Sequence, residues 1–212
     1  MKKVKLILMC IAFSATVMAA DKVIQLPKPN MNRNTSSVMK ALSERKSTRE
    51  YASRPLSMAD LSDLLWAANG FNRPAESKRT APSARNVQDV DVYVILPQGT
   101  YLYNAKDDRL ELVAAGDHRA VVAGPQEFAK NAPVSLLLVS NLDKLGNTTS
   151  KGTQLMGAVD VGIVSQNISI FCSAVNMGTV PRGTMDVNKL KTILKLKDSQ
   201  LPLINHPVGY MK

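Results

Sequence analysis

Cysteine and histidine are scarce in this chain of 212 residues. One of the two cysteines, Cys10, lies in an N-terminal stretch that we expect to be removed, which leaves Cys172 alone. A disulfide within the mature chain is therefore excluded, and its stability must come from packing. The two histidines, His118 and His206, are accompanied by no cluster of cysteines. We therefore predict no metal site and structural roles for both histidines.

Aromatic residues are also few, at 5% of the chain, and they do not alternate with basic residues. Proteins that bind single-stranded nucleic acid use aromatic side chains as stacking platforms, so no nucleic-acid partner is expected. The formal net charge of +10 at pH 7 favours anionic partners in general, from a nucleotide or phosphate to a membrane surface.

The first twenty residues have the composition of a signal peptide. Three lysines precede an apolar stretch, residues 6–17, which is too short to remain as a membrane anchor, and alanines at 19 and 20 suit cleavage. We expect an exported, periplasmic protein with no stable membrane insertion after cleavage. A small residue should precede a lipid-attachment cysteine, but Met9 precedes Cys10, so a lipoprotein is not expected. Cleavage removes three lysines and no acid, which changes the charge from +10 to +7.

The remaining chain is long enough for one domain with a substantial core. Residues 21–32, which contain two prolines, are expected to form a tether before a single domain at 33–212. The apolar patterns predict helices at 34–45, 57–70, 125–131, 153–177 and 186–196. They predict strands at 90–96, 101–104, 109–113, 133–140 and 201–210, with an extended segment at 179–183. This order indicates an α+β fold in which helices cover one sheet.

Two of these helices and one loop have further features. Ser57 and Asp60 form a capping box, and Gly70 ends the helix that follows. The helix at 153–177 is apolar on most sides, so we expect it to be buried all round, in a core or between subunits. Residues 71–89 are polar and helix-poor, and a loop of that length suggests a function.

The first candidate site is the sequence ERKSTREY, residues 44–51. Arg45, Ser47 and Arg49 alternate, so an extended segment presents all three on one side, where they could bind an anion with Lys46 nearby. A solvated charge run is the competing interpretation.

The second candidate is the segment 79–86 in the long loop. Pro82, Ser83 and Asn86 could pack on a planar heterocycle and hydrogen-bond its rim, although an ordinary turn also favours these residues.

The third candidate is the polar middle of the longest helix. Gln166 and Asn167 are costly to bury without partners, so they either bond neighbouring backbone or line a site or interface. Asp160 and Ser165 add to a polar content that argues against a membrane span.

Taken together and in this order, these segments resemble the FMN-dependent nitroreductase family. The resemblance covers residues 33–211, and the middle of the chain looks most like the branch that includes the thiazole- and oxazole-forming peptide dehydrogenases. It is carried by ERKSTREY, APSARN, GTYLYNAKDDRLELVAAGDHR, DVGIVSQNISIFCSAVNMGTVPRG and HPVGY.

The resemblance implies an intertwined homodimer with FMN at the junction of the two subunits and the long helix in the interface. In the family pattern, Arg45, Lys46 and Ser47 match the phosphate-binding segment, and Arg49 matches the residue at the pyrimidine edge of the flavin. Reduced flavin carries negative charge near N1 and O2, which a cation there would stabilise. FMN carries the chemistry, so no catalytic side chain is expected.

The resemblance assigns the remaining contacts to two further segments and to Gln126. The segment that packs on the flavin from the partner subunit matches Pro82, Ser83, Ala84 and Asn86. Gln126 matches a residue that reaches the ring or ribityl chain. The strand whose backbone N–H points at flavin N5 matches Val180, Pro181, Arg182 and Gly183.

Two departures from the family pattern stand out. Gly183 occupies a position where well-known nitroreductases have an acidic residue. The chain also stops at Lys212, where those enzymes continue with basic residues that reach the phosphate, so either Lys212 substitutes or FMN is held less tightly.

We therefore expect an exported FMN-dependent oxidoreductase that works by ping-pong electron transfer. A small-molecule donor reduces FMN, and a nitroaromatic, a quinone or a similar electron-poor acceptor removes the electrons. NAD(P)H is not expected in a periplasm, so the donor is left open. The alternative is an FMN-binding or flavin-scavenging protein without turnover.

Overall fold

The computed structural model describes residues 20–212, and the predicted signal peptide lies outside these residues except for its last position. The fold is built on a seven-stranded antiparallel sheet with the order β1-β6-β5-β4-β7-β9-β8. Its strands are β1 (Val23–Gln25), β4 (Val90–Leu96), β5 (Gly99–Asn104), β6 (Arg109–Ala115), β7 (Val134–Asn141), β8 (Met177–Thr179) and β9 (Gln200–Tyr210).

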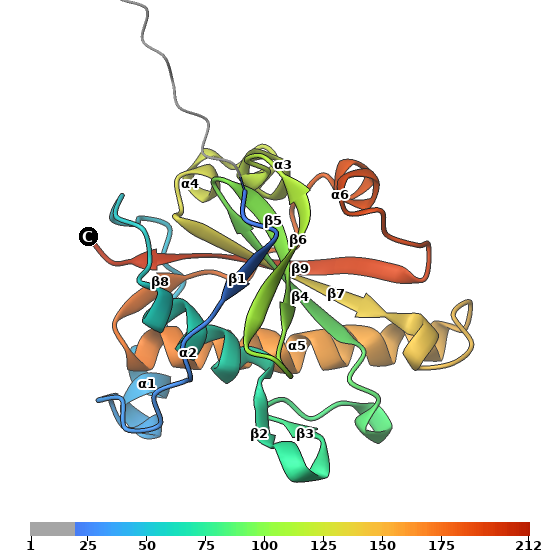
Figure 1. Cartoon of the computed structure of the whole chain (residues 1–212), viewed down its shortest axis with the longest axis horizontal. Coiled ribbons are helices and arrows are strands. Elements are labelled where there is room, and N and C mark those ends of the chain that lie inside the picture. Colours follow the sequence, from blue (N-terminus) through green and yellow to red (C-terminus); the bar gives the residue numbers. More distant parts are fainter. Residues whose placement is uncertain (1–19) are drawn as a thin grey trace, which may run out of the picture.

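Helices cover both faces of this sheet (Figure 1). They are α1 (Val38–Glu44), α2 (Met58–Asn69), α3 (Arg119–Ala123), α4 (Glu127–Lys130), α5 (Lys151–Ala174) and α6 (Val187–Leu194). The predicted α+β fold is confirmed: α2 and α5 pack on one face, and α3 and α6 pack on the other. The short helix α3 was not predicted, because five residues are too few to show a helical period.

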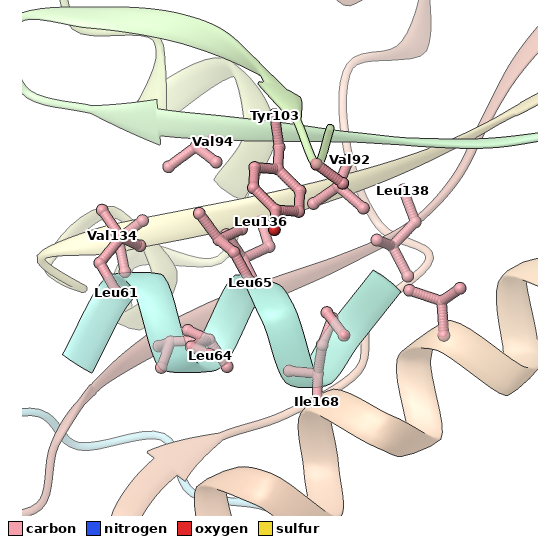
Figure 2. Close-up of a cluster of buried hydrophobic side chains, with 14 of the residues drawn as sticks. Leu61, Leu64, Leu65, Val92, Val94, Tyr103, Val134, Leu136, Leu138 and Ile168 are labelled. Carbon is pink, nitrogen blue, oxygen red and sulfur yellow. The ribbon is translucent and has the colours of Figure 1, made fainter. Parts of the chain in front are cut away.

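The larger core lies between α2, α5 and the sheet. Figure 2 shows Leu61 and Leu65 of α2 pointing toward the strands, with Ile168 of α5 close by, and Leu64 belongs to the same core. Ser57 caps α2 as predicted, since its hydroxyl accepts a hydrogen bond from the Asp60 N–H at 3.0 Å.

The smaller core lies on the opposite face of the sheet. Tyr93 of β4 and Leu137 of β7 pack there against Val122 of α3 and Leu190 of α6. Strands β4 and β7 are thus buried on both faces, which explains the nearly continuous apolar run predicted as a strand at 133–140.

The predicted tether at 21–32 is wrong for its first part. The segment Val23–Gln25 forms the edge strand β1 and pairs with β6, and Ile24 lies opposite Leu110. Leu26 is buried in the larger core. Both prolines follow β1, so they do not interrupt the ladder, but they concealed a strand of only three residues.

Within one chain the long helix α5 is not buried all round, so it is not a pure core helix, and its burial between subunits stays a prediction. Its inner residues pack on the sheet, but its N-terminal half exposes apolar side chains, and so does α1. These side chains are between 42% and 76% exposed, namely Leu155, Met156 and Val159 of α5 and Val38, Met39 and Leu42 of α1. Along α5, Gln166 is exposed, and the Asn167 amide reaches the Ala68 carbonyl at 3.4 Å.

The predicted loop at 71–89 contains some regular structure. A small hairpin of β2 (Phe71–Arg73) and β3 (Lys78–Arg79) is followed by a single turn of 3-10 helix at Ala84–Asn86. Arg85 and Asn86 have φ of 53° and 56°, in the left-handed region.

Candidate functional site

The segment 45–49 runs from the end of α1 along β8. The Thr48 N–H donates to the Thr179 carbonyl at 2.9 Å, and the Tyr51 hydroxyl donates to the Thr48 carbonyl at 2.7 Å. Gly178 allows this close approach, because a Cβ added there would lie 2.7 Å from Cγ2 of Thr48. The contacts hold the segment extended at the sheet edge.

The side chains of this segment alternate as the sequence predicted. Lys46 and Thr48 line a cavity of about 410 Å³ with Cys172 and Met177. Burial raises the pKa of the Cys172 thiol well above its usual range, so the thiol stays protonated. The exposed Arg45, Ser47 and Arg49 do not line this cavity, and the alternation of an extended chain places them on the other side of the segment.

Phe128 of α4 brings two of the predicted regions together. The guanidinium of Arg49 lies 5.9 Å from the centre of its ring, and that of Arg182 lies 5.5 Å from the same centre. Both distances are in the range of cation–π contacts. We call Arg49, Gln126, Phe128 and Arg182 the Phe128 cluster.

Arg182 is the buried member of this cluster. Its guanidinium donates to the Gln126 Oε1 at 2.7 Å, to the Asn205 Oδ1 at 2.8 Å and to the Ala123 carbonyl at 2.6 Å. Burial lowers the pKa of Arg182, yet no such shift removes the charge of a guanidinium in a protein. Within residues 20–212 no carboxylate forms a salt bridge with Arg49 or Arg182. The cluster is therefore positive, and its exposed member, Arg49, is accessible to an anion.

The backbone of 180–183 was predicted to offer an N–H group. The Arg182 N–H is already used, because it donates to the Asn205 carbonyl at 2.9 Å, and Pro181 has none. Val180 is buried, whereas Gly183 is exposed, and in the described part of the chain its N–H has no protein acceptor. Gly183 is thus the residue of this segment that could donate to a bound molecule.

The C-terminus ends beside Glu50, in the sequence that also contains the segment 45–49. The Lys212 ammonium lies 4.0 Å from the Glu50 carboxylate, and Arg54 stacks 3.5 Å from the Tyr210 ring centre. Exposed cations from two distant parts of the chain thus gather at this edge of the sheet, including Lys212, which the sequence suggested as a phosphate ligand.

The predicted segment 82–86 lies in another part of the fold than the segment 45–49. The Ala84 N–H donates to Asp160 of α5 at 2.9 Å, whereas α1 meets α5 at Ser173, whose hydroxyl donates to the Ala41 carbonyl at 2.7 Å. Thirteen residues of helix separate these two contacts, about 20 Å at 1.5 Å per residue. One chain does not bring Pro82, Ser83, Ala84 and Asn86 to the Phe128 cluster.

The side chains of Ser83 and Asn86 bond locally. The Ser83 hydroxyl accepts from the Gln88 N–H at 2.8 Å, and the Asn86 amide reaches the Ser77 carbonyl at 3.4 Å. Pro82 and Asn86 are exposed.

His206 connects α5 to β8 behind the site. It is fully buried between the Ser165 hydroxyl, 2.7 Å from Nε2, and the Thr179 hydroxyl, 3.1 Å from Nδ1. The Thr179 hydroxyl donates to the Pro207 carbonyl, so it accepts from Nδ1–H, and Ser165 donates to Nε2. Burial lowers the pKa of His206 to about 3, which keeps the imidazole neutral.

Acid should therefore destabilise the protein partly through His206. An unfolded histidine has a pKa of about 6.5, so between there and about 3 the unfolded state binds more protons. Stability is then lost as pH falls, by about 1.4 kcal/mol per pH unit in that window. His206→Gln keeps a donor and an acceptor but does not titrate. We expect urea unfolding at pH 4.5–7.5 to show a shallower loss for the variant, and parallel curves would contradict this role.

Several residues of the site were missed by sequence reasoning. Phe128 lies within the sequence GPQEF, and in a chain so poor in aromatics it was the signal that could have been used. Asn205 and Thr179 come from strands that pair only in the fold, so no local spacing reveals them.

Comparisons with known proteins agree with this fold. Residues 42–210 match the sequence model of the nitroreductase family. A protein of Methanocaldococcus jannaschii described as a nitroreductase is 30% identical over 177 residues, which cover 79% of this chain and 88% of that protein. An FMN reductase (NAD(P)H) of Bacillus subtilis is 25% identical over 187 residues, 82% of this chain and 65% of that enzyme.

Solved structures share the architecture. A protein of Ralstonia eutropha JMP134 described as a nitroreductase superposes with a TM-score of 0.84 at 34% identity, over 91% of this chain and 90% of that one. The NADPH:FMN oxidoreductase of Vibrio harveyi superposes with a TM-score of 0.61 at 18% identity, over 82% of this chain and 69% of that one, which shows a shared fold.

Proposed function

Because the chain belongs to the nitroreductase family, we propose that it is an FMN-dependent oxidoreductase with its cofactor at the Phe128 cluster. The observation that carries the proposal is the positive charge of this cluster. Arg49 and Arg182 meet at one aromatic ring without a carboxylate partner in residues 20–212, beside the exposed Arg45 and Ser47. This donor set fits the charge of a phosphate and the edge of a flavin.

The residues of one chain would hold the cofactor in two ways. Arg45, Ser47 and Lys212 would bind the phosphate with charge-assisted hydrogen bonds, whereas Lys46, which the sequence grouped with them, lines the cavity on the other side of the segment. Arg49, Gln126 and the 180–183 backbone would face the flavin, which supplies the electron transfer when bound. Arg49 would stabilise the negative charge that reduced flavin carries, and this favours the reduced state.

The segment 82–86 would complete the site from a second copy of the chain. Its contact with Asp160 lies about 20 Å along α5 from the contact of Ser173 with α1, and this separation supports a role in another subunit's cluster. A homodimer formed through the exposed apolar sides of α1 and α5 would bury that surface, and its twofold axis would exchange the two segments reciprocally.

The reaction we propose is ping-pong electron transfer from a small-molecule donor to an electron-poor acceptor such as a nitroaromatic or a quinone. The flavin reductases of Bacillus subtilis and Vibrio harveyi use NAD(P)H or NADPH by name. Export to a periplasm, which the N-terminal sequence suggests, would instead favour a quinol or protein donor.

A cofactor titration tests this function. The protein should be purified without added flavin and titrated with FMN by calorimetry and visible spectroscopy, and its mass in solution measured. FMN that stays with a dimer through gel filtration supports the proposal. Stopped-flow reduction by NADH, NADPH and a quinol then distinguishes an enzyme from a flavin carrier, since a carrier would not be reduced by any of them. A monomer that does not bind FMN would refute it.

Arg49→Ala should weaken FMN binding about 10- to 100-fold. Removing a charged hydrogen-bond donor costs about 1.5–3 kcal/mol. The redox potential of bound FMN should also fall, because a cation that stabilises the reduced state is lost. Arg73→Ala is the matched control, because this exposed arginine lies in the β2–β3 hairpin. Equal affinity and potential in both variants would remove the role given to Arg49.

A further inference from the structure

Two carboxyl groups are buried together at the base of the 83–88 loop. Asp89, just before β4, is 0% exposed, and Asp160 of α5 is 2% exposed. Ser140 links them: it bonds Asp89, and on α5, three residues before Asp160, a Cβ added at Gly157 would meet the Ser140 hydroxyl, so this turn of α5 packs against the Asp89 partner. The Ser140 hydroxyl of β7 donates to the Asp89 Oδ2 at 2.7 Å, and the Ala84 N–H donates to the Asp160 Oδ2 at 2.9 Å.

One oxygen of this arrangement has no partner if both groups are ionised. The Asp89 Oδ1 is buried and accepts no hydrogen bond from any donor in the described residues. An unsatisfied carboxylate oxygen beside a second buried carboxylate is costly, because two like charges repel strongly where water is excluded. A proton placed between the two carboxyl groups removes one of the two charges. It also gives the unpartnered Asp89 Oδ1 a hydrogen bond with the Asp160 carboxyl group.

Among the described residues, no basic group neutralises the pair. The Lys144 ammonium bonds the Gln88 carbonyl at 3.0 Å and Asp91 at 3.3 Å. The Arg85 guanidinium donates to the Leu145 carbonyl, and Arg79 donates to the Gln88 side chain. Within residues 20–212 neither Asp89 nor Asp160 forms a salt bridge.

The pair supports the loop from both sides. Asp160 binds the backbone at Ala84, and Asp89 fixes the end of the loop, since its carbonyl accepts from the Asn141 N–H at 2.8 Å. Between them, Ser83 and Gln88 close the loop on itself. Arg85 and Asn86 hold a left-handed backbone inside it, a conformation that persists only when its surroundings fix it.

We propose that Asp89 and Asp160 share one proton and that Asp160 thereby acts as the positioning residue that holds the 83–88 loop for the cofactor. Its role toward the cofactor rests on the proposed function, whereas the shared proton stands on the contacts within this chain. The loop is held in the proton-sharing form and is loosened when the pair loses that proton.

The direction of the pH effect follows from the buried position of Asp89. Burial and the neighbouring Asp160 raise the pKa of Asp89 to about 6, against the opposing hydrogen bond from Ser140. A carboxyl that binds its proton more tightly with the loop closed favours closure at low pH. This advantage is lost as pH rises from about 4 to about 6, so the loop opens more readily above pH 6.

Hydrogen exchange of the Ala84 amide, measured without FMN and corrected for intrinsic exchange, tests the pair. Between pH 4 and 8 the wild-type protection should fall, by about tenfold for each pH unit by which the closed loop raises the pKa of Asp89. Asp89→Asn mimics the protonated acid, because its amide can donate to Asp160 while its oxygen accepts from Ser140. We expect this variant to keep full protection at every pH, and Asp143→Asn, a surface control, to follow the wild type.

Asp160 variants test the positioning role. Asp160→Ala removes the acceptor of the Ala84 N–H and should expose this amide at all pH values, and Asp160→Asn should restore its protection. An infrared band of a protonated carboxyl should persist at pH 5.5 in the wild type and be absent from Asp89→Asn. A missing band, or a wild-type pH profile in Asp89→Asn, would overturn the shared proton.

FMN affinity separates this inference from the proposed function. Tenfold or weaker binding by Asp160→Ala, recovered in Asp160→Asn, supports the positioning role. Wild-type affinity in Asp160→Ala would overturn that role. A protein that binds no FMN but shows the expected exchange profile would refute the proposed function and the cofactor role, and would support the shared proton alone.

Discussion

Replacing Arg182 with methionine should lower the free energy of unfolding by about 3 kcal/mol and weaken FMN binding, because the Phe128 cluster loses one of its two cations. Its guanidinium serves three acceptors, and at least one has no substitute. The Asn205 amide nitrogen already donates to the carbonyls of Arg182 and Thr184. The amide group therefore cannot flip, and its Oδ1 would be left without a donor once the guanidinium is removed. An unsatisfied buried acceptor costs about 1–3 kcal/mol, and hydrogen bonds to a charged group are worth about 1.5–3 kcal/mol each.

Urea unfolding with and without FMN measures this effect. Arg182→Lys keeps the charge but loses the planar fork, so its loss of stability should be intermediate. Arg54→Met is the control for an arginine that stacks on an aromatic ring but is exposed. A loss below about 1 kcal/mol for Arg182→Met would show that water or neighbouring groups satisfy the three acceptors.

Gly178→Ala should displace the segment 45–49 from β8. The new Cβ would lie 2.7 Å from Cγ2 of Thr48 and 3.1 Å from its Cβ, closer than packed atoms allow. Relief requires the segment to move outward, which lengthens the 2.9 Å bond from the Thr48 N–H to Thr179. Overpacking of this kind costs about 1–3 kcal/mol, and FMN affinity should fall with it because Arg49 moves too.

A second substitution tests whether the clash is the cause. Thr48→Ser removes the methyl group that the alanine would meet, so Gly178→Ala combined with Thr48→Ser should recover part of the stability and affinity. Gly152→Ala is the control, since its Cβ would meet only the Ser150 hydroxyl at 3.6 Å. Equal losses in the single and double variants would show that another contact, such as Tyr51, limits the site.

The sequence predicts those parts of the fold that local chemistry determines. The helix after Ser57 and the strand at 133–140 were both predicted, because a cap and an apolar run are visible within a few residues. The strand β1 was not, because its three residues gain their order from pairing with β6. For α5 the sequence left burial in a core or between subunits open, because an apolar composition does not tell which apolar residues face the sheet.

The candidate site was predictable only in part for a related reason. Alternation along 45–49 placed Arg45, Ser47 and Arg49 on one side of an extended segment, a feature of the chain itself. The use of the Arg182 N–H by Asn205, and the binding of Gln126 by the same arginine, depend on strands and helices far apart in sequence. Gly183 is left as the available donor of its segment only after these partners are known.

The pairing of β1 with β6 has a practical consequence for truncation. Shortening the chain to residue 33, as a tether would permit, would leave one side of β6 with unpaired backbone amides and carbonyls, and would uncover the core at Leu26. An open strand edge of this kind recruits other chains and promotes aggregation. Expression trials should therefore begin upstream of Lys22, whose carbonyl accepts a hydrogen bond from the Leu112 N–H at 2.9 Å.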